Sequence, residues 1–343
     1  MQWDVFCRVI DNHGDLGVCW RLAADLAARG QTVRLWVDDP IALHWMAPDH
    51  ALAPGIRVLH WVEPLPDVQP GDVVVEAFGC DPPAYFVERM AQAASGPPPV
   101  WINLEYLSAE DYVERSHGLP SPQPTGNGAM TKWFFYPGFT PATGGLLREP
   151  HALQPGAPPW VELEIWPHPG ERIVSLFAYA DAPFSALFDL LEDQPTLLLI
   201  CAGASQAPAL AALAGRPQRQ LRARALPWLT QRDYDRLLHA CDLNFARGED
   251  SIVRAMWPGA PFVWHIYKQS DDVHERKLKA LLNRMQAEPA VRRLSRAWNG
   301  LDAWPAALPD AAAWRAACQQ WRAGLLEQSD LTSQLLRFVA SKR

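Results

Sequence analysis

At 343 residues, the chain is long enough for two domains of ordinary size. Charged residues make up 20% of it and hydrophobic residues 49%, a composition typical of a globular protein rather than a disordered one. The formal net charge of −7 argues against a general affinity for nucleic acid, because proteins that bind nucleic acid are usually basic.

The six cysteines are scattered along the chain and none forms a C-x-x-C pair, so zinc and redox motifs are not expected. They fit small buried side chains in a reducing compartment. The first residues run directly into a predicted strand, which leaves no room for a signal peptide, and no apolar run approaches membrane-spanning length. We expect a cytoplasmic protein without a metal or cofactor, whose partners include neither nucleic acid nor membrane.

The chain opens with the pattern of a βαβ unit. An apolar run at residues 5–10 leads through a glycine-containing loop into a helical segment over residues 18–29. Gly14 and Gly17 allow a ligand to approach the backbone where a Cβ would clash. The start of the helix presents unpaired N–H groups, which suit a phosphate or a sugar oxygen.

Two carboxylates, Asp11 and Asp15, lie in this loop, although carboxylates repel a phosphate. Two acids beside an anion site indicate a place where a proton is taken or a cation is held. A nicotinamide site is one alternative, since Asp38 is suitably spaced for a ribose-binding acid. The loop is G-x-x-G without a leading glycine, however, and Asp15 stands where a pyrophosphate would sit. No G-K-[ST] follows the glycines, which excludes a P-loop.

Strands then alternate with helices, which indicates a parallel sheet covered on both faces. Such sheets bind ligands beyond the carboxyl ends of their strands, where Asp11, Glu76 and Glu105 all fall. We therefore expect these three acids to face one crevice. Further strands are predicted at residues 32–37, 56–61, 73–78 and 100–104, and a helix near 83–94.

Three segments end the first half. Residues 121–128 are rich in Pro, Gly and polar residues and predict a surface loop. The aromatic run 133–139 predicts either a last strand in the core or a partner contact. The proline-rich segment 151–159 predicts a linker, so we expect a first domain over residues 1–155 and a second over 156–343.

A second alternating pattern follows the linker. Helical patterns at residues 311–326 and 331–339 end the chain, and we expect C-terminal helices that can pack back on the first domain. The remaining predicted strands lie at 172–179, 196–201, 243–245 and 261–266, and the helices at 184–192, 234–240, from 252 onward and at 273–283.

The segment 247–251, with the sequence RGEDS, lies where a predicted strand gives way to a helix. Asp250 or Ser251 is well placed to cap that helix. Arg247 and Arg254 could meet a diphosphate. A capped helix with a salt bridge is the alternative from spacing alone. The position at a second strand-to-helix crevice favours the functional interpretation.

Aromatic and polar side chains follow other strands of the second half. Phe177 and Tyr179 end its first strand and suit stacking on a base or a sugar, although core positions are equally open. Trp228 and Gln231 offer an aromatic face and an amide, the pair needed to read a pyrimidine. His265 by itself would more often be a core histidine than a catalyst.

Two α/β domains, with acids in one and nucleotide-binding features in the other, describe a sugar-nucleotide glycosyltransferase of the GT-B type. In this fold two Rossmann-like domains face each other across a central cleft. No D-x-D metal motif occurs in a suitable loop, which agrees with a metal-independent enzyme. In such an enzyme a helix N-terminus and arginines would stabilise the departing diphosphate.

Five motifs in this order closely resemble the family of EarP, the elongation factor P arginine rhamnosyltransferases, over essentially the whole chain. They lie at residues 6–23, 104–110, 136–148, 247–255 and 261–269. The resemblance implies inverting transfer of L-rhamnose from dTDP-β-L-rhamnose to one arginine of translation elongation factor P. It also implies that this modification activates the factor for relief of ribosome stalling at polyproline.

Residue roles follow from the resemblance by motif. Asp15 would be the general base, and Asp11 would help to orient the guanidinium. Trp228 and Gln231 would flank and read the thymine. The full set of donor-binding residues implied is Asn12, Gly14, Gly17, Phe177, Tyr179, Trp228, Gln231, Arg247, Glu249, Asp250, Ser251, Arg254 and Tyr267.

The expected chemistry suits these residue types. An arginine side chain is cationic and a poor nucleophile, with a pKa above about 12. One carboxylate that holds the guanidinium and another that accepts its proton would overcome that difficulty. Attack on the face opposite the leaving dTDP would invert the anomeric carbon, and an acidic crevice would suit a positively charged protein loop. A transferase with a small-molecule acceptor and a non-catalytic module that binds a translation factor stay open as alternatives.

Overall fold

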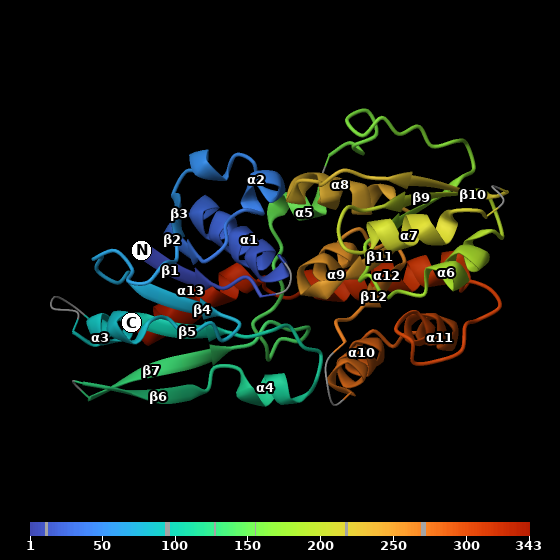
Figure 1. Ribbon diagram of the computed structural model, residues 1–343. Helices are drawn as coiled ribbons and strands as arrows, with labels where there is room; N and C mark the ends of the chain where they lie inside the picture. Colours follow the sequence, from blue (N-terminus) through green and yellow to red (C-terminus); the bar gives the residue numbers. More distant parts are fainter. Residues whose placement is uncertain (11–12, 93–96, 127, 155, 217–218, 269–271) are drawn as a thin grey trace. The chain divides into compact units, whose positions relative to one another are not determined.

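A computed structural model of the chain describes residues 1–10, 13–92, 97–126, 128–154, 156–216, 219–268 and 272–343. These residues form two compact units, Met1–Glu149 with Gln328–Arg343, and Pro150–Glu327. Figure 1 shows the elements of both units. The first unit thus ends a few residues before the expected boundary at 155. It also includes the last helix, α13 (Leu331–Lys342).

The first unit is built on a sheet that, in the described residues, has seven strands in the order β3-β2-β1-β4-β5-β7-β6. The pairs from β3 to β7 are parallel, as the alternating pattern predicts, and β6 pairs antiparallel with β7. The strands are β1 (Gln2–Cys7), β2 (Thr32–Val37), β3 (Ile56–His60), β4 (Val73–Ala77), β5 (Val100–Leu104), β6 (Pro120–Thr125) and β7 (Gly128–Phe135).

Helices cover both faces of this sheet because its side chains alternate between them. Val5 of β1 packs in the cluster that contains Leu16 of α1 and Leu335 of α13. The next residue, Phe6, packs in the cluster of the other face with Phe86 of α3. The helices of the first unit are α1 (Gly14–Ala28), α2 (Leu43–Met46), α3 (Ala84–Ala91), α4 (Tyr112–Ser116) and α13, with a short 3₁₀ turn at His50–Leu52.

The surface loop predicted at residues 121–128 is wrong over most of its length, because Pro120–Thr125 forms the edge strand β6. Its prolines occupy every second position, at Pro120, Pro122 and Pro124. In an antiparallel pair this spacing turns all of the missing N–H groups toward the same side, the open edge of the sheet. Composition alone predicts a loop here, whereas the spacing permits an edge strand.

The second unit contains a parallel sheet, whose described strands run in the order β10-β9-β8-β11-β12. The strands are β8 (Arg172–Leu176), β9 (Thr196–Ile200), β10 (Leu221–Ala225), β11 (Leu243–Arg247) and β12 (Phe262–His265). The helices are α5 (Pro150–Leu153), α6 (Phe184–Leu191), α7 (Gln206–Leu213), α8 (Gln231–Ala240), α9 (Gly248–Met256), α10 (Val273–Arg284), α11 (Pro289–Trp298) and α12 (Ala311–Leu326). Part of the expected linker at 151–159 is therefore the helix α5.

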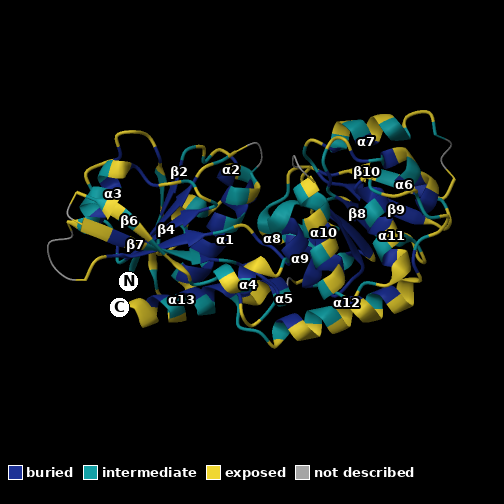
Figure 2. Cartoon of the chain, turned by 90° about the horizontal axis from the view of Figure 1, so that it is seen from below, coloured by how far each residue is buried: buried dark blue, intermediate teal, exposed yellow. Residues whose placement is uncertain are grey.

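Burial in the second unit follows the same alternation. Leu197 and Leu199 of β9 pack in one cluster with Leu237 of α8. Trp298 of α11 lies against Phe245 of β11, with ring centroids 4.8 Å apart. Figure 2 shows the strand β9 buried and exposed residues along the outer side of the helix α12. No helix in the described ranges is both long and apolar enough to cross a membrane.

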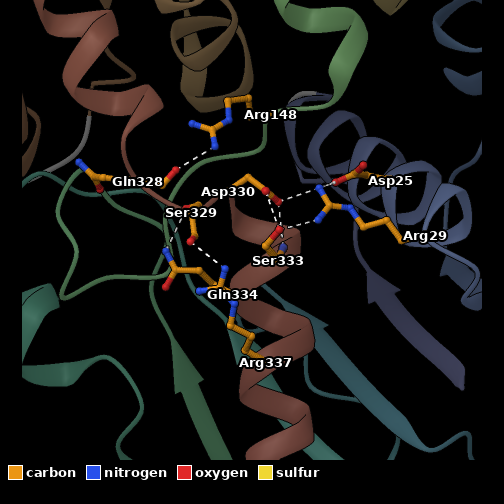
Figure 3. A network of polar contacts seen from close by, with 9 residues as sticks. All are labelled: Asp25, Arg29, Arg148, Gln328, Ser329, Asp330, Ser333, Gln334 and Arg337. Atoms are coloured by element: carbon orange, nitrogen blue, oxygen red, sulfur yellow. Dashed lines mark hydrogen bonds and ion pairs between the residues drawn. The ribbon is translucent and has the colours of Figure 1, made fainter.

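An ion-pair network fixes α13 to the end of α1 (Figure 3). Arg29 donates from Nη1 to Ser333 Oγ (2.6 Å) and from Nη2 to Asp25 and Asp330 (2.8 Å each). Asp330 also caps α13, since its Oδ1 accepts from the backbone N–H of Ser333 (2.8 Å). The network therefore joins a helix cap to a partly buried guanidinium and holds the C-terminal segment in the first unit.

Replacing Asp330 by Ala should destabilise α13 by about 2 kcal/mol, because the change removes both a helix cap and an ion pair. Asp310 provides the matched control. It caps α12 by accepting from Ala313 N–H (2.8 Å), and no arginine of the described residues pairs with its carboxylate. Asp310→Ala should cost α12 about 1 kcal/mol. Native-state hydrogen exchange of the two helices measures both changes, and equal losses would contradict the role given to Arg29.

Candidate functional site

The predicted acidic loop of the first unit is described from residue 13 onward, so Asp11 and Asn12 of the predicted site lie outside the described residues. Gly14 begins α1, and a Cβ added there would meet no described atom within 4 Å. Gly17 is buried in the first turn, where its N–H donates to His13 O (2.9 Å). The start of α1 therefore leaves open space at Gly14, beside Asp15.

Asp15 lies in the first turn of α1 with its carboxyl half-buried. Burial raises the pKa of Asp15 to about 6, and a hydrogen bond from Tyr106 opposes the rise. The Tyr106 hydroxyl donates to Asp15 Oδ2 over 3.4 Å, a long hydrogen bond. A carboxylate with this pKa is ionised at neutral pH and still binds a proton readily, which suits a general base.

Tyr106 is a site residue to which the sequence analysis assigned no role, although it lies in the motif at 104–110. It is the second residue after β5, and its ring stacks on Phe78 with centroids 4.6 Å apart and planes 22° apart. Phe78 follows β4 and has a φ of +59°, a conformation that few non-glycine residues adopt. The ends of two neighbouring strands thus place an aromatic shelf beside Asp15.

Glu105 and Glu76, the other two acids expected at the carboxyl ends of the strands, differ in how deeply they are buried. Glu105 is half-buried at the end of β5, and its Oε1 accepts from Asn103 Nδ2 (2.9 Å). Glu76 is fully buried in β4, where it accepts from Lys132 Nζ (2.7 Å) and Trp101 Nε1 (3.0 Å). The expectation that Glu76 faces a crevice is wrong, because Lys132 and Trp101 engage its carboxylate inside the sheet.

In the second unit, Arg247 lies between two aromatic rings at the end of β11. Its guanidinium carbon is 4.6 Å from the ring centroid of Phe177 and 4.9 Å from that of Tyr179. Burial lowers the pKa of Arg247 from its ordinary value, and nearby Tyr179 opposes that change. The aromatic pair Phe177 and Tyr179 and the separate motif of Arg247 are therefore brought together around one cation.

Gly203 and Trp228 complete this arrangement, which we call the Arg247 cluster: Phe177, Tyr179, Gly203, Trp228 and Arg247. A Cβ added to Gly203 would lie 3.5 Å from Phe177, 3.8 Å from Arg247 Nη2 and 4.0 Å from Trp228. The Trp228 side chain is 50% exposed, so part of its face is open to a ligand. Gly203 was missed as a site residue, although a glycine just after β9 was the available signal.

The helix α9 begins at Gly248 with Arg247 as its N-cap residue, and no side chain caps it. The prediction that Asp250 or Ser251 caps a helix starting at 252 is therefore wrong. The chain turns into the helix earlier because Gly248 adopts a φ of +69°. A Cβ added to Gly248 would lie 3.7 Å from the Tyr179 hydroxyl. The first turn of α9 thus begins directly beside the Arg247 cluster.

Acidic residues occupy the first turn of α9. Glu249 and Asp250 are half-buried there and Ser251 is buried. Glu249 Oε1 lies 3.5 Å from Lys277 Nζ of α10. Carboxylates at this end of a helix interact favourably with its dipole. A stabilising role for Glu249 therefore stands beside the expected role in donor binding.

Arg254 has a different surrounding from Arg247. It is buried and pairs with the buried Asp235 of α8, Nε to Oδ1 and Nη2 to Oδ2 at 3.1 Å each. This is the salt bridge that the spacing left open as an alternative. The pair joins α8 to α9 inside the unit, and a contact of Arg254 with the donor stays a prediction.

The remaining predicted residues lie around the same strand ends. Tyr267 is 47% exposed, and its ring centroid lies 5.5 Å from that of Tyr179. Gln231 is the first residue of α8, after Thr230, whose side chain caps that helix by accepting from Asp233 N–H. Within the described ranges, no group of three or more His, Cys, Asp or Glu side chains is arranged to hold a metal ion.

Tyr106→Phe should raise the pKa of Asp15 above about 6, because the hydroxyl that favours the ionised carboxylate is lost. A ¹³C NMR titration of the Asp15 carboxyl measures the shift. Tyr112→Phe is the control, since Tyr112 is similarly exposed and its ring contacts Tyr136 instead. A pKa that is unchanged in Tyr106→Phe would remove Tyr106 from the electrostatics of Asp15.

Curated relatives resemble the chain over nearly its whole length. It is 44% identical to the protein-arginine rhamnosyltransferase of Pseudomonas putida over 352 aligned residues, which cover 93% of this chain and 90% of that one. It is 41% identical to the protein-arginine rhamnosyltransferase of Pseudomonas aeruginosa, with 99% of each chain covered.

Solved structures show the same architecture. One described as the structural basis for EarP-mediated arginine glycosylation of translation elongation factor EF-P has a TM-score of 0.67 at 30% identity and covers 100% of this chain and 99% of its own. The glycosyltransferase VinC has a TM-score of 0.55 at 14% identity, with 100% of each chain covered. These neighbours are GT-B glycosyltransferases, so the predicted fold class is confirmed.

The family model described as elongation factor P (EF-P) rhamnosyltransferase EarP matches residues 3–340. The match includes all five motifs on which the resemblance rests. The chain belongs to the EarP family of EF-P rhamnosyltransferases.

Proposed function

We propose that this glycosyltransferase moves L-rhamnose from dTDP-β-L-rhamnose to an arginine side chain of EF-P. The Pseudomonas relatives are named protein-arginine rhamnosyltransferases, and the similar solved structure concerns arginine glycosylation of EF-P. The observation that carries the proposal is Asp15, a half-buried carboxyl with a pKa of about 6. Such a base suits an acceptor that must lose a proton as it reacts.

Asp15 is the general base of the proposed reaction. A guanidinium nitrogen attacks the anomeric carbon, the bond from that carbon to the diphosphate oxygen breaks, and the nitrogen's proton passes to Asp15. Because the free guanidinium has a pKa above about 12, the proton leaves only as the new C–N bond forms. Asp11 would orient the guanidinium by charge-assisted hydrogen bonds. Attack opposite the departing dTDP inverts the anomeric carbon.

The Arg247 cluster is the proposed donor site. Arg247 and the backbone N–H groups at the start of α9 would take up the negative charge of the departing diphosphate without a metal ion. Phe177, Tyr179 and Trp228 offer faces for the sugar and the thymine, and Gln231 offers the amide that reads the base. Glu249, Asp250, Ser251 and Tyr267 lie in the same region and are proposed as further donor contacts.

The proposed acceptor is a protein with a reactive arginine on a basic loop. The net charge of −7 favours approach of such a partner over a nucleic acid. A translation factor is cytoplasmic, so we infer that the transferase acts in the cytoplasm. Modified EF-P would then be the form that relieves stalling at polyproline.

Incubation of the protein with EF-P and dTDP-β-L-rhamnose should add one deoxyhexose to EF-P, detected by intact mass spectrometry. Asp15→Asn should lower the rate at least about 100-fold while dTDP binding is kept, because only the proton acceptor is lost. Asp38→Asn is the control, since an amide oxygen can still accept the Val9 N–H that Asp38 Oδ1 accepts (2.9 Å). No mass gain with wild type would instead favour a small-molecule acceptor or a non-catalytic binding module.

Glu249→Ala should raise the donor KM about tenfold if Glu249 contacts the donor, since a charge-assisted hydrogen bond is lost. Lys277→Met is the matched variant, because it breaks the same ion pair and leaves the Glu249 carboxylate in place. Steady-state kinetics with varied donor separate the two. Equal effects of both variants would show that the ion pair alone matters and would remove Glu249 from the donor site.

A further inference from the structure

His265 is a buried residue beside the Arg247 cluster that has no part in the proposed reaction so far. It ends β12, and 1% of its surface is exposed. Its Nδ1 accepts the backbone N–H of Tyr179 over 3.1 Å. A ring nitrogen that accepts a hydrogen bond carries no proton, so the neutral ring has its hydrogen on Nε2.

The backbone around His265 is fixed on both sides by one buried amide. Asn299 accepts from Ile266 N–H (3.0 Å) and donates to Trp264 O (2.8 Å). The ring of Trp298 lies 5.3 Å from the His265 ring. The histidine is therefore held in place independently of the residue that it contacts across the sheet.

Tyr179, by contrast, lies beyond the last residue of β8 and no longer belongs to that strand. Its ring centroid is 5.2 Å from that of His265 and 4.9 Å from the Arg247 guanidinium carbon. Arg247 and His265 are register partners in the β11–β12 pair. His265, at the end of β12, thus contacts Tyr179 through its backbone N–H and its ring. The Tyr179 ring in turn lies against the Arg247 guanidinium.

Burial is the main reason why the His265 ring stays neutral. Burial lowers its pKa to about 4. Asp181 opposes that change, while Lys268 and Arg247 add to it. Asp181 and Lys268 are themselves paired at 2.5 Å. A protonated ring could not accept the Tyr179 N–H and would place a second cation beside Arg247, so the neutral ring is the form that fits this position.

We propose that His265 is a positioning residue for the nucleotide sugar. Through the backbone of Tyr179 it holds that ring against Arg247, so that the guanidinium is presented to the diphosphate. The inference rests on the proposed function, because it takes the Arg247 cluster as the donor site. It predicts that the acceptor atom at position 265 matters more than the imidazole itself.

Two variants of the full chain test this, with dTDP as the probe in isothermal titration calorimetry. His265→Leu removes the acceptor and should weaken dTDP binding about tenfold, because the Tyr179 N–H loses its partner. The kcat at saturating donor should stay near that of wild type. His265→Asn restores an acceptor oxygen near the place of Nδ1 and should bind within about twofold of wild type.

His239→Leu is the matched control in the same unit. His239 is half-buried, its Nε2 lies 2.9 Å from Ala152 O, and burial lowers its pKa as well. Loss of this contact should leave dTDP affinity unchanged. The proposal would be overturned if His265→Leu bound dTDP as tightly as wild type does. It would also be overturned if His265→Asn bound dTDP no more tightly than His265→Leu.

The tautomer of the His265 ring can be measured in the wild-type protein, without a variant and without bound donor. ¹⁵N NMR of the His265 ring should show the Nε2–H tautomer from about pH 5 to about pH 8, and a proton on Nδ1 would overturn the proposal. Wild type that shows this tautomer but binds no dTDP would refute the donor site, and the inference with it. Wild type that binds dTDP while His265→Leu binds equally well would refute the inference alone.

Discussion

The desolvation of one carboxylate, Asp15, is the interaction on which this account depends. Burial at the first turn of α1 raises its pKa from an ordinary 3.8 to about 6. The folded state therefore binds the proton more tightly than the unfolded state does. Stability is greatest below the ordinary pKa and falls as pH rises through about 6, where the ionised group is left half-buried. At neutral pH the ionised Asp15 therefore lowers the stability of the folded state. Such a loss of stability is common where an active site holds a reactive group.

The rest of the first unit holds α1 in place. Arg21 of α1 forms a buried ion pair with Glu149 (3.6 Å), the last residue before the chain enters the second unit. At its other end, α1 is tied to α13 through Arg29. In the second unit, strand ends hold the corresponding residues. Phe177, Arg247 and His265 all lie at or just beyond the carboxyl ends of β8, β11 and β12. The carboxyl ends of parallel strands therefore position the candidate donor site.

Local patterns were enough to predict most of the framework. Residues 32–37, 100–104 and 311–326 were predicted with their observed bounds, because apolar runs and helical periodicity are strong local signals. The helix α11 was not predicted, although Pro289 in its first turn was an available signal. The hydrogen bonds of Tyr106 with Asp15 and of Tyr179 with His265 could not be predicted, because they join residues 91 and 86 positions apart and no local pattern encodes them. The partner of Arg254 could not be predicted either, since Asp235 lies 19 residues earlier in the chain.

The pH dependence of kcat/KM for rhamnosyl transfer to EF-P tests the central claim most directly. If Asp15 must be ionised to accept the proton, the rate should rise with pH and level off above an apparent pKa of about 6. The residual activity of Asp15→Asn should lose that dependence. A wild-type profile that is flat through this range, or the same apparent pKa in Asp15→Asn, would contradict the account.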